Sequence, residues 1–177
     1  MILESGQIAL PIALLVSVYV STASFIGAGY RLPVLVLSAR YGMFSIPILL
    51  LVSTIALVHA FVSHDFSVRY VAENSNLAMP TTYTWVAFYA GNAGSMLFIA
   101  LVFSVLSLIA VVSMSRRLYW STPYSTGLMS FVLAFFLAVI VFLANPLEQL
   151  SFIPEDGQGI NPLLVHFGMF IHPPVQM

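Results

Sequence analysis

The 177-residue sequence contains no cysteine and no lysine, and it has little charge of either sign. Without cysteine, the chain has no disulfide, no thiolate metal ligand, no CxxC redox pair and no thiol nucleophile. The five basic residues are outnumbered by six acidic ones, so no basic excess is available to neutralise a phosphate backbone. These absences exclude thiol chemistry and nucleic-acid binding.

The sequence is instead rich in apolar residues. Hydrophobic residues make up 60% of the chain and charged residues 6%, and the mean hydropathy is +1.03. A soluble domain carries about 25% charged residues. This composition predicts an all-α integral membrane protein with four transmembrane helices, since each hydrocarbon crossing needs about 20 apolar residues. The expected spans cover about residues 8–30, 42–62, 94–114 and 126–144.

The loops between these spans differ in charge. Cytoplasmic loops accumulate arginine and lysine. The two short loops have arginine and no acid, whereas the loop of about residues 63–93 and the tail of residues 145–177 have acids. We therefore expect a bundle over residues 1–144, with both long loops and both termini on the outer face. The short-loop arginines are Arg31, Arg40, Arg116 and Arg117.

Small residues repeat at helical spacing in the first and fourth spans. Such stripes let helix backbones approach closely in lipid, and they predict close packing within a helix bundle rather than a specific dimer. The stripes are Ser17, Ser21, Ser24 and Ala28, and then Gly127, Ser130, Ala134 and Ala138.

The loop of residues 63–93 begins with apolar and polar residues in alternation. Phe66, Val68 and Tyr70 alternate with polar residues, a pattern typical of an extended segment at the membrane surface. The adjacent pair His64 and Asp65 is interpreted as a solvated pair, with support of a ligand as the alternative. His59, one turn before the loop in the sequence, is expected to be an interfacial residue rather than a metal ligand.

The tail contains the strongest candidate ligand, His172, which is followed by Pro173 and Pro174. A proline disfavours helix in the residue before it, and two prolines stiffen the backbone that follows. Neutral imidazole is a common axial ligand of haem iron. From these residues alone, His172 is either a ligand or a surface histidine beside a turn, and it ranks above His64, His166 and His59.

Several motifs together resemble the cytochrome c maturation F (CcmF) family, the haem lyase component of cytochrome c biogenesis. The resemblance covers about residues 62–174, and the earlier part of the chain matches in hydrophobicity and orientation. The motifs are the loop His64–Asn76, Gly91-Asn92-Ala93-Gly94, Asn145-Pro146, Pro154-Glu155-Asp156-Gly157, Asn161-Pro162-Leu163-Leu164, Met169 and His172-Pro173-Pro174. The Asn92-Ala93 pair departs from the family, which commonly has more strongly interacting polar residues there.

The resemblance implies a component of a haem lyase in the inner membrane, with both termini on the periplasmic face. It implies that His172 is an axial ligand of a non-covalently bound b-type haem, which is then attached to apocytochrome c. The family continues beyond His-Pro-Pro into further spans and a tryptophan-rich segment with the second axial histidine. The sequence is therefore expected to be an N-terminal portion that is not active alone. Its expected partners are a C-terminal haem lyase portion and other cytochrome c maturation proteins. The alternative is a non-catalytic four-helix membrane scaffold that binds a partner protein without haem.

Overall fold

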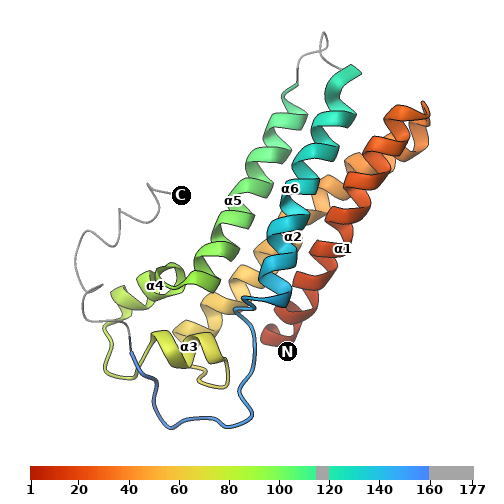
Figure 1. Ribbon diagram of the computed structural model, residues 1–177. Helices are drawn as coiled ribbons and strands as arrows, with labels where there is room; N and C mark the ends of the chain where they lie inside the picture. Colours follow the sequence, from red (N-terminus) through yellow and green to blue (C-terminus); the bar gives the residue numbers. More distant parts are fainter. Residues whose placement is uncertain (115–119, 160–177) are drawn as a thin grey trace.

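The computed structural model describes residues 1–114 and 120–159, and within these residues the chain is helical (Figure 1). The described part contains no strand and one isolated β-bridge, between Val68 and Gln149. Four helices are long and apolar enough to cross a membrane, which confirms the predicted class of an all-α membrane protein with four spans. The helices are α1 (Ile2–Gly29), α2 (Pro33–Val62), α3 (Arg69–Asn74), α4 (Thr81–Ala90), α5 (Asn92–Val112) and α6 (Thr122–Phe142).

The four long helices form a bundle with two different ends (Figure 1). One end holds α3, α4 and the segment after α6, and we call it the loop end. The start of α1 also lies there, because Gln7 Nε2 donates to the Leu147 carbonyl over 2.8 Å. The opposite end, the turn end, holds the connection between α1 and α2 and the start of α6. Helix α1 packs mainly against α2 and α6.

The connection between α1 and α2 is shorter than the sequence predicts. Helix α2 begins at Pro33 rather than near residue 42, so the connection is three residues long and Arg40 lies two turns inside the helix. Proline is favoured at the first helical position because its φ angle is already helical and its missing N–H would be unpaired there. Leu32 before it is extended, as expected for a residue that precedes proline.

The small-residue stripes lie mostly inside the bundle, where only Ala28 and Ala138 are partly exposed. Ser17, Ser21 and Ser24 are all buried, and Ser21 Oγ donates to the Gly127 carbonyl of α6 over 3.0 Å. On the other side of α1, Ser53 Oγ of α2 donates to the Gly6 carbonyl, also over 3.0 Å. Short side chains therefore allow α1 to approach both of its neighbours closely enough for direct side chain to backbone hydrogen bonds.

Gly6 provides a test of this close approach. A Cβ atom at Gly6 would collide with the Ala56 side chain and touch Leu147 Cδ1 at 3.1 Å, whereas one at Gly29 would meet nothing within 4 Å. We expect Gly6→Ala to lower the free energy of unfolding by about 1–3 kcal/mol through overpacking. Gly29→Ala is the matched control and should be neutral or stabilise by up to about 1 kcal/mol, as alanine favours helix. Thermal unfolding in mild detergent measures both, and equal midpoints would contradict the prediction.

Candidate functional site

The predicted ligand His172 and the neighbouring His166 lie outside the described residues. What the structure does describe is the loop end, including the segment from Leu143 to Gly159 that precedes the predicted ligand in the sequence. The geometry of this segment against α3 is the basis of the candidate site.

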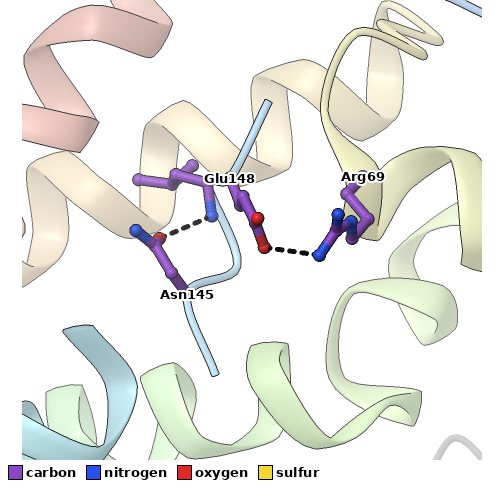
Figure 2. A network of polar contacts seen from close by, with 4 residues as sticks. Arg69, Asn145 and Glu148 are labelled. Atoms are coloured by element: carbon purple, nitrogen blue, oxygen red, sulfur yellow. Dashed lines mark hydrogen bonds and ion pairs between the residues drawn. The ribbon is translucent and has the colours of Figure 1, made fainter. Parts of the chain in front are cut away.

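The segment after α6 pairs with the residues that enter α3. The Arg69 amide donates to the Glu148 carbonyl over 2.9 Å, and the Leu150 amide donates to the Ser67 carbonyl over 2.8 Å. Arg69 Nη1 also lies 2.9 Å from Glu148 Oε2, and Asn145 in the same turn accepts from the Leu147 amide (Figure 2). Both charged side chains are half exposed, so the ion pair contributes little and the backbone hydrogen bonds dominate.

The same segment returns to the other end of α3. The Gln158 amide donates to the Ala72 carbonyl over 2.8 Å, and the Gly159 amide donates to the Ser75 carbonyl over 3.1 Å. Asp156 Oδ1 accepts from the Leu77 amide over 2.9 Å. We call these contacts of Ser67–Leu77 with Glu148–Leu150 and Asp156–Gly159 the α3 clamp. The clamp fixes Gly159, the last described residue before the predicted His-Pro-Pro tail.

The α3 clamp differs from the extended segment that the sequence predicts. Phe66, Val68 and Tyr70 are all buried, but helix begins at Arg69. The alternation therefore extends only as far as Val68, where the β-bridge to Gln149 lies. Tyr70, Val71 and Ala72 are buried in succession, which differs from the alternate burial expected of a strand with one face on the surface.

Tyr70 connects α3 to the junction between α4 and α5. Its hydroxyl donates to the Phe88 carbonyl over 3.1 Å and accepts from the Gly91 amide over 3.0 Å. Burial raises the pKa of Tyr70 to about 12, although hydrogen bonds from the Gly91 and Gly94 backbone act in the opposite direction. Cβ atoms at Gly91 and Gly94 would each lie 2.7 Å from the Tyr70 hydroxyl oxygen, so the two glycines make room for this ring.

Two of the candidate histidines, His59 and His64, belong to the described part of the chain. His59 is exposed near the end of α2, and His64 has a left-handed φ of 50° and a buried Nδ1 without a partner. Asp65 accepts from the Ser67 amide and hydroxyl, which favours local turn formation over a pair with His64. Within residues 1–114 and 120–159, no three His, Asp or Glu residues converge as they would around a metal ion.

A polar cleft of about 270 Å³ lies between α3 and the end of α6. Its lining contains both signs of charge, so it suits a polar or zwitterionic group better than a simple anion or cation. The sequence could not indicate this cleft, because its walls come from residues that are distant in the chain. The charged and polar lining residues are Arg69, Tyr70, Glu73, Asn145 and Glu148.

Known proteins are similar to this chain over nearly its whole length. The cytochrome c-type biogenesis protein CcmF of Pseudomonas fluorescens is 36% identical over 177 residues, which cover 97% of this chain and 26% of that protein. CcmF of Haemophilus influenzae is 31% identical over 99% of this chain and 27% of its own length. A solved structure named Cytochrome c Heme Lyase CcmF superposes with a TM-score of 0.84 at 23% identity, over 99% of this chain and 27% of that one. No family model matches the chain.

Four apolar helices and an ordered loop end define this chain as a multi-pass membrane protein. Its sequence corresponds to the N-terminal part of the CcmF family, and the fold agrees with that correspondence. The chain spans about a quarter of the length of the curated relatives it matches.

Gly157 tests the α3 clamp. A Cβ atom there would collide with the Ser75 carbonyl oxygen and lie 2.9 Å from the Ala72 carbonyl oxygen. We expect Gly157→Ala to weaken the clamp, so that the Gln158 and Gly159 amides exchange with deuterium about ten-fold faster or more. Arg69→Gln is the control and should change exchange by less than about five-fold, because it removes only a half-exposed ion pair. Unchanged exchange in Gly157→Ala would show that the clamp does not depend on this approach.

The raised pKa of Tyr70 predicts that the protein loses stability at high pH. Its pKa in the folded protein is raised to about 12 from an ordinary value of 10.0, so the stabilisation is complete below pH 10 and declines as pH rises toward 12. The free energy of unfolding should fall by about 1.4 kcal/mol per pH unit in that window. Urea unfolding at several pH values gives the free energy of unfolding of the wild type and of Tyr70→Phe. The difference between the two pH dependences is the contribution of the Tyr70 hydroxyl. The phenylalanine variant should be less stable at neutral pH and should show a shallower alkaline decline; parallel declines would contradict the assignment.

Proposed function

We propose that this chain is the membrane-embedded N-terminal part of a cytochrome c haem lyase and acts in cytochrome c biogenesis. The observation that carries this proposal is similarity over 97% or more of the chain to proteins named for cytochrome c-type biogenesis. In this proposal the chain helps to hold haem at the outer face of the inner membrane while the haem is attached to apocytochrome c.

The charge distribution supports this orientation. All six acidic residues lie at the loop end, at the start of α1, around α3 and after α6, whereas Arg31 and Arg40 lie at the turn end. Cytoplasmic ends of membrane proteins are enriched in basic residues. We therefore assign the turn end to the cytoplasmic face and the loop end, with both termini, to the periplasmic face.

The α3 clamp gives the described residues a role in positioning. It fixes the backbone at Gly159, thirteen residues before His172 in the sequence, and so limits where the tail begins. His172 would supply one axial imidazole to the haem iron.

Bound haem would supply the reactive vinyl groups and the iron, and this chain would orient it. The second axial ligand would come from the remaining portion of the haem lyase, which is three-quarters of the length of the relatives. Partners in this proposal are that portion, apocytochrome c and other cytochrome c maturation proteins. The chain by itself is then expected to produce no holocytochrome c.

His172→Ala tests the proposal in a complex of this chain with the remaining CcmF portion, supplied as a separate polypeptide. We expect the variant to insert and co-purify normally, but to shift or lose the haem Soret band and lower the yield of holocytochrome c by about ten-fold or more. Added imidazole should partly restore the spectrum by filling the vacant axial position. Haem absorption and haem staining of the cytochrome measure these effects.

His59→Ala is the matched control, since His59 is an exposed histidine in the same chain and should tolerate replacement. An unchanged spectrum and cytochrome yield in His172→Ala would show that His172 is not a haem ligand. Co-purification without haem would favour the non-catalytic membrane scaffold instead.

A further inference from the structure

The turn end contains a second cavity, at the opposite end of the bundle from the α3 clamp. A cleft of about 740 Å³ lies between the connection of α1 to α2 and the start of α6. This volume is within the range of small-molecule binding sites. The residues that give the cleft its chemistry are Arg31, Arg40, Trp120 and Tyr124.

The two arginines of this cleft have no acidic partner. Neither forms an ion pair within the described part of the chain, and all six acidic residues belong to the start of α1, to α3 and its flanks, or to the segment after α6. Arg31 and Arg40 both line the cleft, so an anion bound there meets two guanidinium groups. Guanidinium groups bind phosphate through paired hydrogen bonds.

Arg31 occupies a position that normally favours glycine. Helix α1 ends with the Leu32 amide donating to the Gly27 carbonyl and the Arg31 amide donating to the Ala28 carbonyl, the pattern of a Schellman motif. The residue at the left-handed position of this motif is usually glycine, but here it is Arg31, with φ of 56°. Backbone strain of this kind concentrates at functional positions. The strained turn places a cation at the cleft at a cost in folding free energy.

A buried hydroxyl adjoins the cleft. Ser24 is 1% exposed and its Oγ has no hydrogen-bond partner among the described residues. It lines a recess of about 50 Å³ together with Arg40, Thr122 and Thr126. The recess shares Val36, Arg40 and Pro123 with the larger cleft. It can hold several water-sized oxygen groups, and an unpaired buried hydroxyl favours a polar guest.

We propose that this cleft binds the phosphate-bearing headgroup of an anionic phospholipid. Arg31 and Arg40 contact the phosphate, and the Ser24 recess accepts a headgroup oxygen. Trp120 and Tyr124 also line the cleft, and such aromatic residues are enriched at membrane interfaces. Val34 and Leu37 beside the cleft are 76% and 52% exposed, so an apolar surface is available for the acyl chains. The exposed apolar surface favours a lipid over a soluble phosphate.

Quenching of Trp120 fluorescence by lipids with brominated acyl chains tests this proposal. The chain has two tryptophans, so Trp85→Phe leaves Trp120 as the single reporter. In detergent micelles, brominated phosphatidylglycerol should quench Trp120 at lower concentration than brominated phosphatidylcholine. Arg31→Gly and Arg40→Gln should each weaken the phosphatidylglycerol effect by about five-fold, the contribution of one basic residue near an anionic surface.

The controls separate lipid binding from folding. Arg31→Gly relieves the left-handed strain and should unfold at the same temperature as its parent or higher, so its loss of lipid cannot come from misfolding. Arg69→Gln removes a cation at the loop end and should leave quenching unchanged. Circular dichroism during thermal unfolding checks each variant.

Three results would overturn the proposal. Equal quenching by the two lipids, or quenching that does not depend on Arg31 and Arg40, would show that the cleft does not select an anionic headgroup. Competition by millimolar inorganic phosphate as strong as that of the lipid would identify a soluble phosphate as the occupant. None of these measurements involves haem, so the result is independent of the proposed role in cytochrome c biogenesis.

Discussion

Backbone hydrogen bonding between α3 and the segment after α6 is the interaction on which the loop end depends. A chain that leaves a membrane helix without regular structure must pair its buried amides and carbonyls, since an unpaired buried group costs free energy. Here α3 and its flanks provide those partners. They pair with the amides of Leu150, Gln158 and Gly159 and with the carbonyl of Glu148, all in the segment after α6. The half-exposed ion pair of Arg69 with Glu148 adds orientation more than stability.

The bundle supports this loop end through close helix packing and through the buried hydroxyl of Tyr70. Short side chains bring α1 against α2 and α6, and the start of α1 reaches Leu147, the residue just before the clamp. Tyr70 then joins α3 to the junction of α4 and α5, where two glycines leave space for its ring. The motif Gly91-Asn92-Ala93-Gly94 thus has a packing reason that does not depend on its middle residues. In the proposed function, this rigidity limits where the His172 tail begins.

The structure departs from the sequence-based expectations at the start of α2 and after residue 65, and both departures have a clear physical cause. Hydropathy indicates the apolar part of a span and not the ends of its helix, so α2 begins nine residues before the expected span and includes Arg40. The proline at residue 33 was a local signal for the true start. The alternation after residue 65 predicts an extended segment at the membrane surface, whereas Phe66, Val68 and Tyr70 are buried by a bridge at Val68 followed by a helical turn.

The sequence by itself determined that the chain lies in a membrane, that it has four spans, and that its acidic and basic residues are separated. These properties follow from the hydropathy and charge of short stretches of the chain. It also contained the motifs that relate the chain to the CcmF family. Tertiary structure alone decided which partners meet: Arg69 and Glu148 are 79 positions apart, and Ser21 and Gly127 are 106 apart. The cleft of Arg31, Arg40 and Trp120 also exists only once α6 lies beside the turn after α1. Such contacts depend on the way helices pack in three dimensions, which no periodicity along the chain encodes.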